Sequence, residues 1–343
     1  MIDEITLDIR QVNKFVRAAR DRAGRCQAIV NGKRCGAPAS ENHAIQKNNS
    51  LKKIWEENKV DHIYTDLFPK GDNESVRFKS IAARKASTFY GFCSKHDQQL
   101  FSPIEQPDSS YSDEAISLMF YRALASEIYG IKSAHKLISL VRDEGRAGVK
   151  KAYASQLSSE FQNEIKYCFR DYRVCGEIIE DEIFAGAASK LKVAAIRLEK
   201  PLPFCFQSLR SPIFDFTGAL ILPKTGEIWD KTLLFGGYIG QFYYIIVAST
   251  HTNLDHGIDQ FLQSFRNISK EQIGRCALFL ALRYSSGCAF FSPAFINKMS
   301  ELSKRNLIKY ARFEVGGGLP REPHNMFSYA PQFNFTTDFE IVR

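Results

Sequence analysis

The chain has 343 residues, of which 44% are hydrophobic and 24% charged, and its formal net charge is +8 at pH 7. This composition is ordinary for a globular protein and excludes the fibrous and disordered classes. The length favours two domains over one, and the modest basic excess is compatible with a polyanionic partner without establishing one.

No apolar run approaches the roughly 18–20 residues that cross a bilayer, and the N-terminal residues lack the pattern of a signal peptide. We therefore expect a cytoplasmic protein with no membrane partner. Thiols stay reduced in that compartment, so the eight cysteines are not expected to form four disulfides. The cysteines without paired spacing, expected to pack as small hydrophobic residues, are Cys168, Cys175, Cys205, Cys276 and Cys288.

The first predicted element is an amphipathic helix from Ile9 to Ala23, where apolar residues recur at helical spacing. Between Arg10 and Arg34 there are eight basic residues and one acidic residue. Each lysine or arginine on such a helix can neutralise a backbone phosphate of nucleic acid, although a solvated face is an equal alternative. The predicted nucleic-acid contacts are Arg10, Lys14, Arg17, Arg20, Lys33 and Arg34.

Two separate segments together predict a tetrahedral zinc site. The dipeptide Asn31-Gly32, a strong signal for a two-residue hairpin, lies midway between the first two cysteines. The second segment has Cys-x2-His spacing just after a glycine. The predicted ligands are Cys26, Cys35, Cys93 and His96. The alternative is that the cysteines are ordinary buried thiols and the histidine begins a helix.

The segment between these two halves predicts a short helix, a strand and a polar loop. The ranges are 50–59, 61–68 and 70–74. Basic and aromatic residues then interleave from Val76 to Phe92, which we interpret as a core element in preference to a stacking surface for nucleic acid. Residues 101–113 are rich in Pro, Ser and Asp and predict a linker, so the domain boundary is placed between residues 1–105 and 112–343.

The second region alternates helical, strand-like and again helical patterns, which predicts an α+β domain with a mainly antiparallel sheet. The expected helices span 112–129, 131–141, 149–172, 255–266, 270–284 and 292–310. The expected strands span 191–198, 203–207, 218–222 and 241–248. His251, with Asp255 and His256 nearby, has the residue types of a metal site, but a helix-capping loop is the favoured interpretation.

The order of the residues between about 25 and 105 resembles the ββα-metal, or HNH, nuclease module, which is built on a treble-clef zinc fold. The residues on which the resemblance rests are the two early cysteines, His43-Ala44-Ile45, Asn48 and Asn49, and the final Cys-x2-His. In that family a histidine is the general base and a divalent ion polarises the scissile phosphate. The resemblance implies a catalytic set of His43, Asn48, Asn49 and Asp97. In this set His43 would be the base and Asn48 or Asn49 would orient it, while Asp97 or His62 would be a ligand for Mg²⁺ or Mn²⁺.

Three features depart from the pattern of that family. Asn42 stands where many members have an acidic metal ligand, and His96 is assigned to zinc. The insert from Asn49 to Phe92 is also long for so small a module. A treble-clef domain that binds nucleic acid without cutting it therefore remains an alternative.

These features predict a nucleic-acid-directed protein, in the first place a metal-dependent nuclease or a toxin-like or defence effector with a structural zinc ion. The alternative is a non-catalytic, zinc-stabilised adaptor that binds nucleic acid or protein. In the first hypothesis the C-terminal domain would sense, regulate or oligomerise, and it could also bind a protein partner. A third option places the activity in that C-terminal domain.

Overall fold

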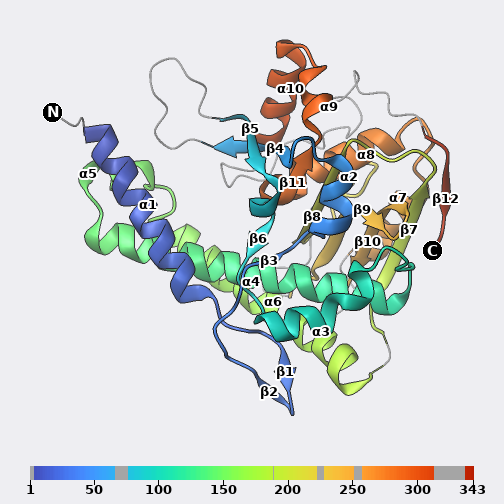
Figure 1. Cartoon of the computed structure of the whole chain (residues 1–343), viewed down its shortest axis with the longest axis horizontal. Helices are drawn as coiled ribbons and strands as arrows, with labels where there is room; N and C mark the ends of the chain where they lie inside the picture. The colour runs from blue at the N-terminus through green and yellow to red at the C-terminus, as the bar shows by residue number, and fades with distance from the viewer. Residues whose placement is uncertain (1–3, 66–75, 188, 222–227, 251–256, 313–336) are drawn as a thin grey trace.

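The computed structural model describes residues 4–65, 76–187, 189–221, 228–250, 257–312 and 337–343. Within these ranges an antiparallel sheet of eight strands carries helices on both faces (Figure 1). The predicted α+β class is therefore confirmed. No helix in the described ranges is both long enough and apolar enough to span a membrane.

The strands of the large sheet come from both ends of the chain. In spatial order they are β12 (Phe339–Ile341), β7 (Lys192–Leu198), β10 (Phe242–Ser249), β9 (Thr232–Ile239), β8 (Phe204–Arg210), β11 (Ala289–Phe291), β4 (Lys59–Thr65) and β5 (Val76–Ala82). Each neighbouring pair is antiparallel.

The centre of the sheet is apolar on both faces. Successive side chains of a strand point to opposite sides, and the central strands carry apolar residues at successive positions. On β10, Ile245 and Val247 belong to one hydrophobic cluster, whereas Ile246 and Ala248 belong to another. Every residue of β9 is buried. Both faces must therefore be covered by helices.

Long helices cover one face. They are α4 (Asp113–Glu144) and α6 (Ser159–Ala185), which contact each other. The hydroxyl of Ser112 accepts a hydrogen bond from the amide of Ala115 and so caps α4. Helix α6 ends at Gly186, whose φ of +69° is left-handed and favours glycine.

Shorter elements cover the other face. They are α7 (Ile258–Arg266), α8 (Ile273–Phe279), η3 (Leu280–Tyr284), η4 (Ser286–Cys288), α9 (Pro293–Asn297) and α10 (Glu301–Arg312). The aromatic residues Phe261 and Phe265 of α7 are fully buried in the cluster on this face.

Helix α1 (Glu4–Ala23) packs away from the sheet, against the far end of α4 and the short helix α5 (Ala147–Ala152). Phe15 of α1 is buried in a separate small cluster with Val141 and Val149. This group of helices forms the left-hand projection in Figure 1.

The rest of the N-terminal region consists of short elements. They are β1 (Ile29–Val30), β2 (Lys33–Arg34), β3 (Asn42–His43), η1 (Lys47–Leu51), α2 (Lys52–Ile54), η2 (Ala83–Lys85), β6 (Thr88–Phe89) and α3 (Ser94–Glu105). Strand β3 pairs with β6 across a long insert. That insert contains β4 and β5, which join the large sheet where Asp61 pairs with Phe291. The sheet therefore continues across the boundary placed at residues 105–112.

Several predicted elements differ from the structure in their extent. The helices expected at 112–129 and 131–141 are the single helix α4, which continues through Gly130. The helix expected at 149–172 is divided, because α5 ends at Ala152 and α6 begins at Ser159. The helix expected at 292–310 is likewise divided into α9 and α10. Apolar periodicity continues across such breaks, so it does not mark them.

Other differences concern strands and the linker. Residues 218–221 form no strand, only an isolated bridge between Phe214 and Leu220. Strand β9 was not predicted, since its unbroken apolar run with two glycines lacks alternation. The linker is shorter than expected, because Phe101 and Ile104 are buried in the last turns of α3. His251, Asp255 and His256 lie outside the described residues.

Candidate metal centre and the adjoining cavity

The first half of the metal centre is a tight hairpin. Asn31 and Gly32 have φ values of +51° and +73°, which suit the two central positions of a type I′ turn. Strands β1 and β2 flank this turn. The amide of Cys35 donates to the carbonyl of Ala28 at 2.8 Å, so the two cysteines are held at the open end of the hairpin.

The second half is the start of α3. Cys93 occupies the N-cap position, and His96 lies in the first turn. The amide of Gln27 donates to the carbonyl of Gly91 at 2.8 Å, which ties the hairpin to the segment before the helix. A backbone contact thus joins two segments that are more than sixty residues apart in the sequence.

The four predicted ligands come together. The ligand atoms of Cys26, Cys35, Cys93 and His96 all lie within 4.8 Å of one another. Nδ1 of His96 is 3.4 Å from the sulfur of Cys26 and 3.4 Å from that of Cys93. The predicted proximity is confirmed, and these side chains could hold a metal ion.

The chemistry of this donor set fits a soft or borderline transition metal, because three sulfurs and one imidazole nitrogen match a closed tetrahedral site. Burial raises the pKa of the Cys26 thiol to about 11. A thiol in such surroundings is protonated at neutral pH unless a cation stabilises the thiolate. A bound metal ion would supply that charge.

The other cysteines are divided between core and surface. Cys175, Cys205 and Cys276 are buried, as expected for small hydrophobic residues, and Cys288 is half-buried. The prediction is wrong for Cys168, which is exposed on α6. Its spacing in the sequence resembles that of the buried cysteines, so only packing distinguishes it.

A cavity of about 150 Å³ adjoins the metal centre. It lies between β3, the η1 segment and α3. The residues that line it are Glu41, Asn42, His43, Gln46, Lys47, Asn48, Asn49, Asp97 and Glu105. All four residues of the predicted catalytic set are among them, and Asp97 directly follows the candidate ligand His96.

His43 is held in one orientation at the end of β3. Its Nδ1 lies 2.9 Å from the carbonyl oxygen of Ala86, so Nδ1 carries the proton and donates. Nε2 then has the free lone pair. Burial lowers the pKa of His43, although the Ala86 carbonyl opposes that effect. The ring is therefore an uncharged potential proton acceptor at neutral pH.

Asp97 lies beside a buried cation. One of its carboxylate oxygens is 4.0 Å from Nη2 of Arg122 on α4, and the same nitrogen is 2.7 Å from the carboxylate of Glu105. The pKa of Asp97 is raised because its carboxyl group is buried, although the charge of Arg122 opposes this effect. The oxygen Oδ1 of Asp97 is buried and accepts no hydrogen bond from the described residues.

The asparagines have unequal roles. Oδ1 of Asn42 accepts hydrogen bonds from the amides of Gly91 and Phe92 at 3.1 and 2.8 Å, so this buried side chain fixes β3 to the segment before α3. Asn49 is also buried, and its amide group can pair with both backbone groups of Gly240 at 3.3 Å. Asn48 is exposed and lines the cavity. Of the two proposed orienting residues, Asn48 alone is therefore exposed on the cavity wall.

His62 does not line this cavity. It lies on β4, with its ring 6.2 Å from the ring of Phe290. The resemblance suggested it as a metal ligand, but the insert carries it into the large sheet, on β4 between β11 and β5. His62 belongs to the part of the sequence that resembles the HNH module, but this did not predict where it lies in the structure.

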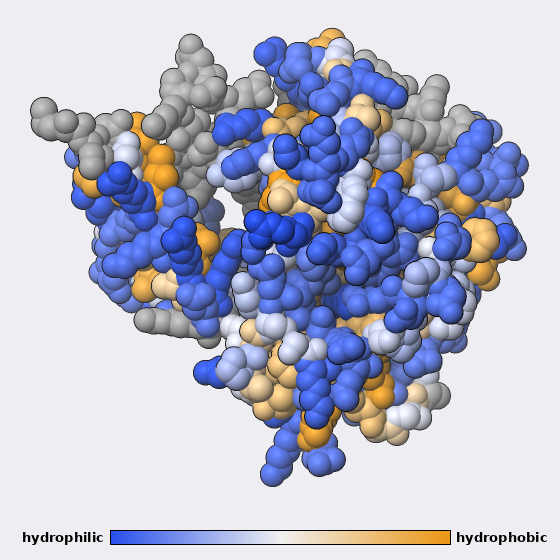
Figure 2. Space-filling view, in the orientation of Figure 1, coloured by the Kyte–Doolittle hydropathy of each residue, from blue (hydrophilic) through white to orange (hydrophobic). Residues whose placement is uncertain are grey.

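Most of the predicted nucleic-acid contacts are exposed. Arg10, Lys14, Arg17 and Arg20 are all exposed on α1, opposite the buried side chains of Phe15 and Ala19. Lys33 is exposed at the hairpin. Arg34 is exposed as well, but its guanidinium also pairs with the carboxylate of Glu180, at 2.7 and 3.0 Å. The face of the molecule in Figure 2 is mainly hydrophilic, including most of the visible side of α1.

Sequence reasoning missed several residues of the cavity. Lys47 follows His43 by four positions, a proximity in sequence that could have identified it. Glu105, which lines the cavity, and the buried Arg122, which pairs with it, gave no such signal, because they meet only when α3 packs against α4. Their roles depend on tertiary contacts.

Comparison with known proteins adds no relative: no family model, curated protein or solved structure matches this chain.

Proposed function

We propose that this protein is a nucleic-acid-directed enzyme, an HNH-like endonuclease that requires a divalent cation and is stabilised by a structural zinc ion. The observation that carries the proposal is the cavity in which His43 and Asp97 meet, next to the Cys3His group. The order of elements supports it as well. A hairpin with two ligands is followed by the paired strands β3 and β6 and then by α3, whose start supplies the other two ligands.

The chemistry follows from the side chains on the cavity wall. Nε2 of the neutral His43 takes a proton from the water that attacks the phosphorus, while the bond from phosphorus to the leaving sugar oxygen breaks and that oxygen takes a proton from solvent. Lys47 offers a positive charge to the phosphate, and the exposed Asn48 can hydrogen-bond to the water or to the imidazole ring. Mg²⁺ or Mn²⁺, held by the carboxylate of Asp97, would neutralise charge on the phosphoryl oxygens; Oδ1 of Asp97 accepts no hydrogen bond from the described residues, although Arg122 lies 4.0 Å from it.

The basic face of α1 supports a polyanionic substrate. Its four exposed cations recur at intervals of four and three residues, which places them on one side of the helix. Within the described part of the chain, none of the four forms an ion pair. Such a stripe can contact successive phosphates of a nucleic acid and give sequence-independent affinity.

A second function is supported by the hydrogen bonds of the asparagines. Asn42 and Asn49 are occupied by backbone groups, and Gln46 donates to the carbonyl of Ile104 at 2.5 Å. Much of the polar wall of the cavity therefore has a structural use. This favours the alternative of an adaptor that binds nucleic acid or protein without cutting it.

The deciding experiment compares His43→Ala with His135→Ala, a matched change at an exposed histidine of α4. Each protein is incubated with DNA and RNA in the presence of Mg²⁺ or Mn²⁺. We expect cleavage by the wild type and by His135→Ala, and at least a hundredfold loss in His43→Ala, the usual size of a general-base effect. The metal content should be equal in all three. A wild type that binds in a salt-dependent way but never cuts would reject the enzyme and leave the adaptor.

A further inference from the structure

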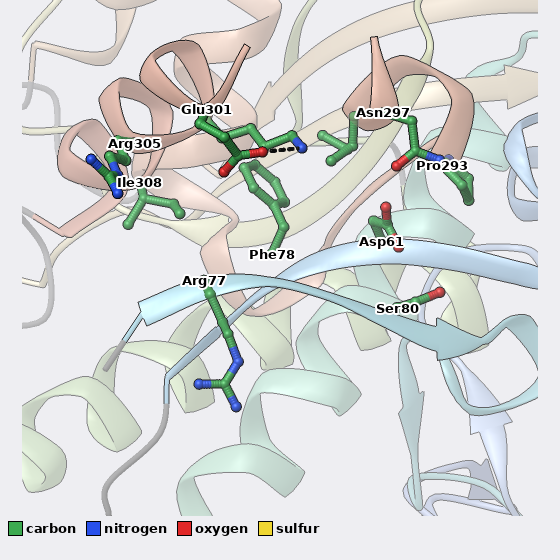
Figure 3. Close-up of a pocket in the computed structure, with 11 residues that line it drawn as sticks. Asp61, Arg77, Phe78, Ser80, Pro293, Asn297, Glu301, Arg305 and Ile308 are labelled. Atoms are coloured by element: carbon green, nitrogen blue, oxygen red, sulfur yellow. Dashed lines mark hydrogen bonds and ion pairs between the residues drawn. The ribbon is translucent and has the colours of Figure 1, made fainter. Parts of the chain in front are cut away.

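A second pocket is separate from the metal centre. It has a volume of about 480 Å³ and lies between the inserted strands β4 and β5 and the helices α9 and α10 (Figure 3). This volume falls within the roughly 300–1,000 Å³ typical of sites for small ligands. None of the residues that line this pocket was predicted from the sequence to be functional.

One end of the pocket is built to accept hydrogen bonds. The carboxyl group of Asp61 on β4 is only 8% exposed, and the hydroxyl of Ser80 on β5 donates to it. A carboxylate has about four acceptor positions, so Asp61 can accept further hydrogen bonds beside the one from Ser80. Asn297 of α9 lies at the same end, as Figure 3 shows. A ligand with adjacent N–H groups would complete the hydrogen bonding of this buried acceptor.

The middle of the pocket is aromatic. The ring of Phe78 points from β5 toward α10 (Figure 3). It meets the ring of Phe291 edge to face at 5.6 Å, which holds it in place. Ile296 also lines the pocket. A planar ring in the ligand can pack here, because aromatic side chains favour stacked or edge-to-face contacts.

Helix α10 brings positive charge to the pocket. Lys304 and Arg305 line it, and Nζ of Lys304 is 2.8 Å from the carboxylate of Glu301, whose side chain is 78% exposed. An ion pair with such an exposed partner contributes little, so the ammonium group can be shared with an anionic ligand at small cost. Arg77 points to the opposite side of β5 in Figure 3, where its guanidinium lies 5.7 Å from the ring of Tyr64.

We propose that this pocket binds a purine nucleotide, with the base against Phe78 and Asp61 and the phosphate at Lys304 and Arg305. The pocket combines a buried acceptor, an aromatic ring and cations, the three kinds of group that suit the base and the phosphate of a nucleotide. Guanine is preferred over adenine. Its Watson–Crick edge presents two neighbouring N–H donors to a carboxylate, whereas that of adenine presents one donor and one acceptor.

The test measures binding to the full-length chain by calorimetry, with GMP, AMP, guanosine and inorganic phosphate as probes. GMP is expected to bind at least tenfold more tightly than guanosine or phosphate alone, since a tenfold change corresponds to about 1.4 kcal/mol. AMP should bind more weakly than GMP. The pocket would be rejected if neither nucleotide binds at millimolar concentration, or if phosphate alone binds as tightly as GMP.

Two variants separate direct contact from an effect on folding. Lys304→Met keeps the aliphatic stem and should weaken GMP but not guanosine. Asp61→Asn replaces two acceptor oxygens by one acceptor and one donor, and should reduce or reverse the preference for GMP over AMP. Lys79→Met, on the face of β5 where Lys79 lies over Tyr64, is the matched control and should change neither affinity. An equal loss in the control, or no change in Lys304→Met, would contradict the proposal.

Nucleotide binding here does not depend on the nuclease activity proposed above. The binding measurements use no nucleic acid and no cleavage assay. Failure of one proposal therefore leaves the other intact.

Discussion

Nη2 of Arg122 lies 2.7 Å from Oε1 of Glu105, and the side chain of Arg122 is only 2% exposed. Its guanidinium also covers the ring of Phe101, 4.1 Å from the ring centroid. This arginine of α4 therefore holds both an acidic and an aromatic residue of α3, the helix that begins at the metal centre. It connects α4, which covers one face of the large sheet, to α3, which begins at the candidate metal centre.

Removal of this arginine should destabilise the protein. Arg122→Ala leaves a cavity beside Phe101 and removes the charge that compensates Asp97 and Glu105. Because Glu105 is partly exposed, we expect a loss of about 3 kcal/mol in the free energy of unfolding, at the low end for breaking a buried ion pair. Chemical denaturation measures it. Arg142→Ala, at an exposed arginine of the same helix, should cost less than about 0.5 kcal/mol.

Metal binding should depend on the four clustered ligands. We expect one zinc ion per purified chain by mass spectrometry of the metal, and a large loss of it in Cys26→Ser. Removal of zinc by a chelator should lower the melting temperature of the wild type, because metal that binds only the folded state stabilises it. Cys168→Ser, at the exposed cysteine, should keep its zinc. Equal zinc content in both variants would contradict the assignment.

The side chain of Asn42 should contribute more to the unfolding free energy than that of Asn48, which also lines the cavity. Asn42→Ala removes the acceptor for two buried amides, those of Gly91 and Phe92. Unsatisfied buried donors cost about 1–3 kcal/mol each, so we expect a loss of at least about 2 kcal/mol in unfolding free energy. The exposed Asn48→Ala should change it by less than about 0.5 kcal/mol. Similar losses in the two variants would show that the hydrogen bonds of Asn42 are not made.

The stability should fall when the pH is lowered below neutrality. Burial, and then the charge of Lys79, lowers the pKa of His62. The unfolded chain therefore takes up a proton near pH 6.5, before the folded chain does. The contribution of His62 to the unfolding free energy should be constant above about pH 7.5 and decrease as the pH falls through about 6.5 and below. Denaturation of His62→Gln should show a smaller decrease than the wild type, with metal content monitored at each pH. The same change at the exposed His135 should leave the pH dependence as it is.

The basic face of α1 should determine how salt affects binding to nucleic acid. If Lys14 and Arg17 each contact a phosphate, the double variant to alanine should reduce the slope of log affinity against log salt by about 0.9 for each lost contact on duplex DNA. Titrations at several salt concentrations give this slope. Lys166→Ala, at an exposed lysine of α6, is the control. An unchanged slope in the double variant would exclude α1 from the binding surface.

Local chemistry made part of the site predictable. Asn31 and Gly32 specify a hairpin because few residues tolerate positive φ at both central positions, and this turn sets the positions of Cys26 and Cys35. The Cys-x2-His spacing places Cys93 and His96 on one helical turn. Such signals depend on residues close together in the sequence, so they can be recognised without knowledge of the fold.

The composition and the runs of apolar residues determined the α+β class, and the motif residues determined which four side chains gather as possible metal ligands. Only the tertiary structure decided that β4 and β5 leave the N-terminal region to extend the large sheet, and that Arg122 reaches Asp97 and Glu105. The reason is physical. Strand pairing at an open sheet edge and contact between helices depend on surfaces that distant segments form together, and no short stretch of sequence contains both partners.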